Sequence, residues 1–350
     1  MGMSLIQLTK NTKKGYYFII LAAMTSALIH VLSKPLLESG NEQIQLNPIV
    51  MAFLIYFVCG IFFTPLTKKS KSTGVFRKKD FAFMGIIGTA EVTALITYFF
   101  GLSTSTAVNA SIFSNSEIIF SLIIALVLFK EKLHIKEYIP FTMIIIGMMI
   151  IPIGNDLYVN NFAISNLVTG DLLIIISGLM YAIDITLCKY LGDRFDEKKV
   201  VQIVSFFSAG ISIALIALFQ IPMDIDLMQL PTIIFMSIVG TGMSTIFFLI
   251  GLRTIGSVRT ILLYSTTSVF GIIFSGAILS EVITPMNVVS TVMVLAGIFL
   301  LRNRLGEEEI ERDIQKTKSV PKRRSSRSKS YRVINRIENE ISFKSWIGAG

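Results

Sequence analysis

Residues 101–133 read GLSTSTAVNASIFSNSEIIFSLIIALVLFKEKL, and residues 251–283 read GLRTIGSVRTILLYSTTSVFGIIFSGAILSEVI. The two stretches align without a gap at an offset of 150 residues, and the alignment extends to residues 151 and 301. Nine positions are identical, and in the first copy they are Gly101, Leu102, Thr104, Val108, Phe120, Ile123, Glu131, Met143 and Gly147. Apolar composition alone does not explain matching glycines and glutamates, so these identities indicate an internal repeat.

The composition indicates a membrane protein. Of the 350 residues, 53% are hydrophobic and 16% are charged, whereas soluble domains contain about 25% charged residues. Several apolar runs of about 18–22 residues are long enough to cross a hydrocarbon core of about 30 Å as a helix. The first run starts near Tyr16, exceeds the length of a signal-peptide core and lacks a cleavage site. We therefore expect it to be retained as a transmembrane helix.

Ten membrane spans are predicted, at roughly residues 16–36, 47–66, 81–102, 107–129, 137–154, 171–190, 200–221, 231–252, 259–279 and 285–301. Connections rich in Lys and Arg alternate with connections that contain neither. The uncharged-or-acidic connections are residues 38–46, 103–106, 155–169, 222–230 and 280–284. Because basic loops stay in the cytoplasm, this alternation predicts that both termini are cytoplasmic.

The repeat divides the predicted spans into two units of five. Since five is odd, the second unit must lie upside down relative to the first. The predicted fold is thus an all-α membrane protein of ten transmembrane helices, built as two inverted five-helix repeats. Its parts are a cytoplasmic N-terminus (1–15), a first repeat (16–154), an external linker (155–169), a second repeat (170–303) and a basic cytoplasmic tail (304–350). Inverted repeats are typical of secondary transporters, which bind substrate near the membrane midplane.

The repeated segment, followed by a span with Gly147 or Gly297, resembles the repeat of EamA-type carriers of the drug/metabolite transporter superfamily. The resemblance covers about residues 15–303, and it implies ten helices and small-molecule transport without specifying a substrate. The family pattern contains a mid-span Glu-Pro pair. In this chain Ile118 and Ser268 stand at the proline positions, and Thr267 replaces the second glutamate. The resemblance therefore gives no ground for expecting a kink at mid-span.

Glu117 is the most informative single residue, because it lies near the centre of a predicted span. A charged side chain at that depth costs at least about 2.5–3.5 kcal/mol and usually faces the protein interior or a wet cavity. Serines share its helix face, and the equivalent helix of the second repeat carries its own polar stripe. Together with polar groups of two further spans, these stripes predict a central substrate cavity. Its candidate residues are Glu117, Glu91, Ser114, Ser121, Tyr264, Thr267, Ser268, Tyr98 and Tyr181.

Burial disfavours the charged form of a carboxyl group, so Glu117 and Glu91 are the candidates for proton coupling. The competing interpretation is that such groups only hold the helices together. Four residues rank lower as cavity residues, because packing or anchoring at span ends explains them well: Asp184, His30, Lys34 and Lys189. Glu131 and Glu281 match in the repeat but lie in loops, where we expect helix capping or loop pinning.

These features predict a secondary transporter of a small organic metabolite that is neutral, zwitterionic or cationic, such as an amino acid or a drug-like amphiphile. A second hypothesis is a sugar or nucleotide-sugar carrier. It requires basic groups for phosphate, hence Lys34 and Lys189 in one central cavity. A third hypothesis belongs to another class, a lipid scramblase or a scaffold that signals through its tail.

The sequence contains no enzyme motif and only two histidines, so we expect no catalysis, no cofactor and no metal site. Six basic residues between 322 and 332 make the tail suitable for anionic lipid headgroups. We expect no nucleic-acid partner, because no folded domain would present these residues. The cytoplasmic membrane is the expected location, and the sequence leaves the oligomeric state open.

Overall fold

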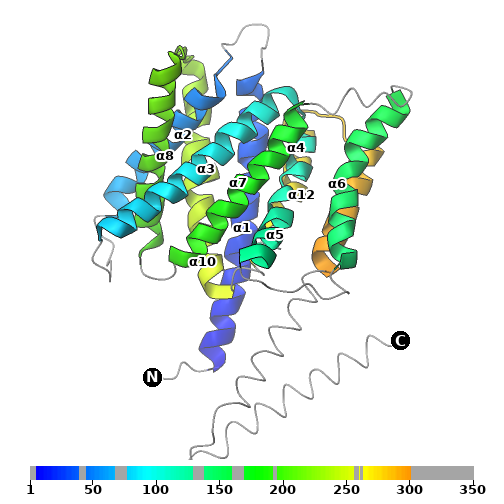
Figure 1. The fold of residues 1–350 in the computed structure, drawn as a ribbon, viewed down its shortest axis with the longest axis horizontal. Helices are drawn as coiled ribbons and strands as arrows, with labels where there is room; N and C mark the ends of the chain where they lie inside the picture. The colour runs from blue at the N-terminus through cyan, green and yellow to red at the C-terminus, as the bar shows by residue number, and fades with distance from the viewer. Residues whose placement is uncertain are drawn as a thin grey trace, which may run out of the picture. The chain divides into compact units, whose positions relative to one another are not determined.

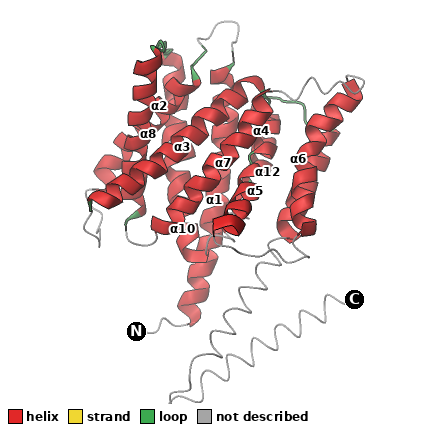
Figure 2. Cartoon of the chain, in the orientation of Figure 1, coloured by secondary structure: helices red, strands yellow, loops and turns green. Residues whose placement is uncertain are grey.

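The structure is a computed structural model that describes residues 5–38, 45–67, 77–128, 138–159, 169–191, 195–255, 260 and 263–300. All regular secondary structure within these residues is helical (Figure 2). The predicted basic tail and Glu131 lie outside the described residues. The described residues therefore agree with the predicted all-α fold class.

In the first half of the chain, the described residues form six helical segments, which are labelled in Figure 1. They are α1 (Leu5–Leu37), α2 (Pro48–Thr67), α3 (Lys78–Thr104), α4 (Ala107–Phe113), α5 (Ser116–Leu128) and α6 (Tyr138–Val159). The second half begins with α7 (Thr169–Leu191) and α8 (Glu197–Phe219). It continues with η4 (Leu227–Gln229), α9 (Leu230–Phe235), the π-helical segment η5 (Met236–Met243), α10 (Ser244–Ile255), α12 (Thr267–Ile278) and a last helix, Pro285–Leu300.

Six helices in the described part of the chain are long and apolar enough to cross a membrane. They are Lys14–Leu37, Pro48–Thr67, Lys78–Thr104, Thr169–Cys188, Glu197–Phe219 and Leu227–Ile255. The protein is therefore an integral, multi-pass membrane protein. Shorter helices lie within the other predicted spans. The count of ten spans and the cytoplasmic position of both termini stay predictions.

The main helix contacts occur in equivalent pairs. The most extensive contacts are α3 with α7, α2 with α8, and α1 with α10. Under the repeat alignment α3 corresponds to α10 and α7 to α1, so the first and third of these contacts are two copies of one interaction. The second contact joins the second helices of the two halves. Each half thus packs mainly against the other half (Figure 1).

Equivalent helices run in opposite directions. Near the C-terminal end of α1, Lys34 donates a hydrogen bond to the carbonyl oxygen of Leu102 near the end of α3 (3.0 Å). Gly170, at the N-terminal end of α7, contacts Gly101 in the same turn of α3. The last turn of α1 and the first turn of its counterpart α7 therefore meet the same end of α3. This antiparallel relation is the one that an inverted repeat requires.

The repeat-matched glycines of α6 and of the helix Pro285–Leu300 lie where these two helices pack closely against each other. A Cβ atom on Gly147 would lie 3.0 Å from the backbone nitrogen of Val294, and one on Gly297 would lie 2.8 Å from the carbonyl oxygen of Pro140. Ser290 also donates a hydrogen bond to the carbonyl oxygen of Gly147 (2.5 Å). Small residues let membrane helices approach this closely, so α6 and the last helix pack backbone against backbone.

The repeat-matched loop residue Glu281 caps a helix of the other half. Its two carboxylate oxygens accept hydrogen bonds from the backbone N–H groups of Ala107 and Val108 at the start of α4, each at 2.9 Å. A carboxylate at this position also interacts favourably with the helix dipole. Asn287 supports the contact by donating to the Asn109 side chain (3.0 Å). The expected capping role is confirmed for Glu281.

We predict that Gly297→Ala destabilises the protein by about 1–3 kcal/mol, the usual cost of overpacking a filled interior. The added methyl group would meet the Pro140 carbonyl, which cannot rotate away as a side-chain end could. The measurement is unfolding in detergent, followed by loss of helical signal. Gly210→Ala is the matched control, because a Cβ atom there meets no atom within 4 Å. Equal stability of the two variants would contradict the backbone contact.

Candidate functional site

Two helix interruptions are the structural basis of the site. The predicted span 107–129 consists of α4 and α5, which are separated by a turn at Ser114 and Asn115. In the second half a turn at Ser265 and Thr266 precedes α12. The two turns lie at equivalent places to within one residue. Helices that are interrupted in this way are typical of transporter binding sites.

Polar side chains satisfy the backbone groups that each interruption frees. Ser114 and Asn115 donate to the carbonyl oxygens of Ser111 and Ile112, at 2.8 and 2.9 Å. In the second half, Thr266 donates to Leu263 (2.7 Å). Thr267 and Ser268 likewise donate to the carbonyl oxygens three residues before them, those of Tyr264 and Ser265. Ser, Thr and Asn compete with the helix in this way, which explains why the breaks form without proline. The predicted spans 107–129 and 259–279 therefore each contain a turn that the missing prolines did not indicate.

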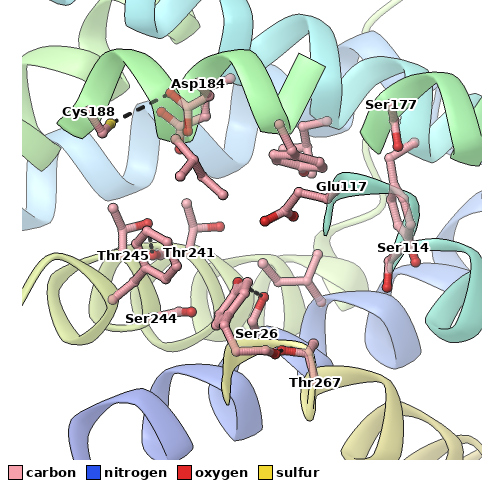
Figure 3. Close-up of a pocket in the computed structure, with 18 of the residues that line it drawn as sticks. Ser26, Ser114, Glu117, Ser177, Asp184, Cys188, Thr241, Ser244, Thr245 and Thr267 are labelled. Atoms are coloured by element: carbon pink, nitrogen blue, oxygen red, sulfur yellow. Dashed lines mark hydrogen bonds between the residues drawn. The ribbon is translucent and has the colours of Figure 1, made fainter. Parts of the chain in front are cut away.

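A cavity of about 140 Å³ lies among the interrupted helices and their neighbours (Figure 3). Side chains of α1, α2, α3, α5, α7, α8, η5, α10 and α12 line it, together with Tyr264 and residues of both turns. A single water molecule needs about 10–15 Å³ of cavity volume, so this cavity has room for several water molecules or a small organic group. Seven of the nine candidate residues line it: Glu117, Glu91, Ser114, Tyr264, Thr267, Tyr98 and Tyr181.

Close contact between α5 and α7 positions Glu117. It lies in the first turn of α5, and its carboxylate extends into the cavity (Figure 3). Ser116 donates a hydrogen bond to the carbonyl oxygen of Ile175 on α7 (3.2 Å). A Cβ atom on Gly178 would lie 2.8 Å from the Glu117 backbone nitrogen, so only glycine allows α7 to pass here. Within the described residues, the Glu117 carboxylate has no hydrogen-bond or ion-pair partner.

Two further carboxyl groups line the same cavity. Glu91 comes from α3, and Tyr56 donates a long hydrogen bond to its backbone carbonyl (3.4 Å). Asp184 comes from α7, where the Cys188 thiol donates to its carboxylate at 3.8 Å (Figure 3). The sequence analysis favoured a packing role for Asp184. The structure instead places its side chain on the cavity wall beside the other acidic groups.

Tyrosine and histidine side chains complete the polar wall. His30 also ranked low in the sequence analysis, but it lines the cavity and shares a hydrogen bond with the Tyr98 hydroxyl. The Tyr264 hydroxyl donates to Ser26 (2.7 Å), which connects the second interrupted helix to α1 (Figure 3). The tyrosines at the cavity therefore come from both halves of the chain.

Three of the predicted residues that the structure describes do not line the cavity. The Ser121 hydroxyl, elsewhere in α5, is buried and has no hydrogen-bond partner among the described residues, and Ser268 bonds to its own turn. Lys34 is 6% exposed and pairs with Glu38 (2.5 Å) in addition to the Leu102 carbonyl. The side chain of Lys189 lies outside the described part of the structure.

Sequence reasoning missed several hydroxyl and amide groups of the wall, namely Tyr56, Asn115, Ser177, Ser205, Thr241, Ser244 and Thr245. Isolated Ser and Thr in apolar spans also serve helix packing, so they carry no distinct signal. Thr241 is the residue that carries a recognisable signal, because it stands between two glycines, Gly240 and Gly242. These residues fall in η5, and π-helical segments often occur at functional sites. The Thr241 hydroxyl is buried without a hydrogen-bond partner at the cavity.

The charge of the wall is one-sided. Among the described lining residues there are three carboxyl groups and no Lys or Arg. A carboxylate within a membrane protein is stabilised by a nearby cation or by taking up a proton. Tyrosine rings can add cation–π attraction, and their hydroxyl groups add hydrogen bonds. The cavity is therefore suited to hold a proton, an ammonium group or an uncharged polar group.

Comparison with known proteins agrees with this architecture. A protein of Methanothermobacter thermautotrophicus, described as an uncharacterized transporter, is 26% identical over 303 residues, covering 82% of this chain and 85% of the relative. A solved crystal structure superposes with a TM-score of 0.59 at 15% identity, covering 85% of this chain and 99% of the other, and so shares the fold. The model of the EamA-like transporter family matches twice, at residues 13–152 and 168–303. Both halves carry the family's repeat, and the chain belongs to the EamA-like transporter family.

Proposed function

We propose that this membrane transporter is a secondary carrier of a small organic metabolite that is neutral, zwitterionic or cationic. The observation that carries the proposal is the cavity wall with three carboxyl groups, tyrosines from both halves and, among the described lining residues, no Lys or Arg. The substrate binds in this cavity near the membrane midplane and reaches each side of the membrane in turn. Interrupted helices and repeated halves support such alternating access.

Proton coupling fits the surroundings of Glu117. Its carboxylate has no partner among the described residues, so its charge is best neutralised by a proton or by the substrate. A carrier in which the two compete for one carboxylate exchanges protons for substrate. Glu91 and Asp184 are further acceptors at the same wall.

Of the sugar and nucleotide-sugar alternatives, the cavity chemistry disfavours the phosphate-bearing nucleotide sugar. A phosphate group requires Lys or Arg, but Lys34 is bound to Glu38 and to the end of α3 instead of lining the cavity. The scramblase and tail-scaffold hypotheses have no comparable support, since the polar groups surround a cavity lined by helices of both halves. We place the carrier in the cytoplasmic membrane, where the tail would lie beside anionic headgroups.

The first prediction for this function concerns Glu117→Gln, which keeps the shape but cannot exchange a proton. A charge-assisted hydrogen bond contributes about 1.5–3 kcal/mol, so uptake should fall roughly tenfold or more and lose its dependence on an inward proton gradient. The measurement is uptake of amino acids, polyamines, organic cations and sugars into proteoliposomes, read by mass spectrometry. Asp224→Asn, at an exposed loop carboxylate, is the control and should behave as the unmodified protein. Unchanged rate and unchanged pH dependence in Glu117→Gln would rule out this role.

The second prediction concerns substrate charge and Asp184→Asn. If Asp184 faces the positive group of a substrate, this variant should weaken binding of cationic compounds about tenfold or more, the equivalent of one charge-assisted bond. Binding of uncharged compounds should change little. The measurement is the ligand-induced rise in melting temperature of the purified protein, with Asp224→Asn as the control. Tighter binding of phosphate-bearing compounds than of cations would favour the nucleotide-sugar hypothesis instead.

A further inference from the structure

Two equivalent helix crossings flank the cavity. Where α3 crosses α7, the contact is formed by Gly101 and Gly170; we call this the first crossing. The repeat offset of 150 residues makes Gly251 the equivalent of Gly101, and α7 aligns with α1 at an offset of 155 residues, which makes Gly15 the equivalent of Gly170. Gly251 and Gly15 lie where α10 crosses α1; we call this the second crossing. The first crossing lies at the predicted external end of the bundle, and the second lies at the predicted cytoplasmic end.

The first crossing is formed by backbone against backbone. A Cβ atom on Gly101 would lie 2.6 Å from the carbonyl oxygen of Gly170 and 3.0 Å from the backbone nitrogen of Ile174. A Cβ atom on Gly170 would in turn meet the carbonyl oxygen of Gly101. The backbones of the two helices therefore come into contact here, with the side chains of Thr104 and Ile174 beside them.

The second crossing is looser, although the same positions face each other. A Cβ atom on Gly251 would meet the side chain of Ile19, the residue equivalent to Ile174. One on Gly15 would lie 2.6 Å from the Ile255 side chain and 3.0 Å from Thr254. The nearest neighbours of both glycines of the second crossing are side-chain atoms, whereas the first crossing combines backbone atoms with the side chains of Thr104 and Ile174. Isoleucine side chains separate the helices at this end.

Among the described residues, a hydrogen bond between two side chains is present at the first crossing and not at the second. Ser105 donates a hydrogen bond to the Asp171 carboxylate (2.5 Å), and both side chains are buried. The equivalent residues at the second crossing are Ile255 and Tyr16, which instead pack in an apolar cluster with Ile19. The hydrogen bond therefore stabilises closure at one end and has no counterpart at the other.

We propose that the two glycine crossings are the two gates of the cavity, and that this structure has the first gate closed by backbone contact, whereas isoleucine side chains keep the second gate from the equivalent backbone contact. The Ser105–Asp171 hydrogen bond favours this resting state. In the alternate state Gly15 and Gly251 come into backbone contact, Ile19 and Ile255 move aside, and Gly101 separates from Gly170. This inference rests on the proposed alternating access, in which the two packed arrangements exchange and substitutions shift their populations.

Alanine at each crossing should shift the populations in opposite directions. Gly101→Ala opposes closure of the first gate, because the methyl group meets backbone atoms. Gly251→Ala meets the Cδ1 and Cγ1 atoms of the buried Ile19 side chain, which must take another rotamer in the present state, and the added methyl group prevents backbone closure of the second gate. Ser105→Ala removes the hydrogen bond without adding volume, so it should shift the populations in the same direction as Gly101→Ala.

The native Cys188 thiol reports which gate is open, because it lines the cavity whereas Cys59 is buried. A membrane-impermeant cationic methanethiosulfonate is applied to either side of vesicles that contain the full chain in known orientation. Cys188→Ser gives the background, and Gly210→Ala is the matched glycine control. We expect Gly251→Ala to increase the ratio of labelling from the second-gate side to labelling from the first-gate side at least threefold. Gly101→Ala and Ser105→Ala should decrease this ratio by a similar factor.

Opposite shifts would support the gate assignment whichever way the chain lies in the membrane. Shifts in the same direction, or ratios equal to that of Gly210→Ala, would overturn it. If Gly101→Ala does not fold, Ser105→Ala tests the same gate. The labelling needs no substrate, so its outcome is independent of the uptake assay. Opposite shifts without uptake would count against the proposed substrates, whereas uptake with unshifted labelling would count against the gates.

Discussion

The site depends on one constraint, that a backbone polar group inside a membrane needs a hydrogen-bond partner within the protein. The turns at Ser114 and Asn115, and at Ser265 and Thr266, interrupt helices at the cavity. Backbone carbonyl groups at these turns lack the regular hydrogen bonds of a continuous helix. Short polar side chains take up the freed carbonyl groups. This allows α5 to begin at the cavity, with Glu117 in its first turn and extended toward the space that a substrate would occupy.

The two halves share a backbone plan but differ in chemistry at equivalent places. Glu117 corresponds to Thr267, so the first interrupted helix brings a charge to the cavity and the second brings a hydroxyl. Ser105 and Asp171 correspond to Ile255 and Tyr16, so one crossing has a buried hydrogen bond and the other has apolar contacts. Symmetry of the backbone supplies two interchangeable arrangements, and differences between the side chains decide which one is more stable.

Several features were predictable because they depend on local composition or on the repeat. Apolar length predicted the helices, and the matched glycines indicated the repeat; the structure adds that Gly147 and Gly297 lie at close helix contacts. The helix breaks were not predicted, because the expected signal was proline and the actual signal is hydroxyl and amide groups that also occur in unbroken helices. Asp184 and His30 were ranked too low, since a sequence does not tell which face of a helix meets a cavity.

By itself the sequence determined membrane insertion, the duplicated plan and the presence of Glu117 at mid-span, because these follow from hydrophobic length, spacing and the cost of a charge in lipid. Tertiary structure decided which polar groups share one wall, since Glu91, Glu117 and Asp184 come from three different helices. It also decided that Gly101 and Gly170 touch while Gly15 and Gly251 are separated by isoleucines. The physical reason is that equivalent residues of the two repeats face equivalent neighbours in the sequence pattern. Only the packing of the folded chain selects at which of the two crossings the helix backbones touch.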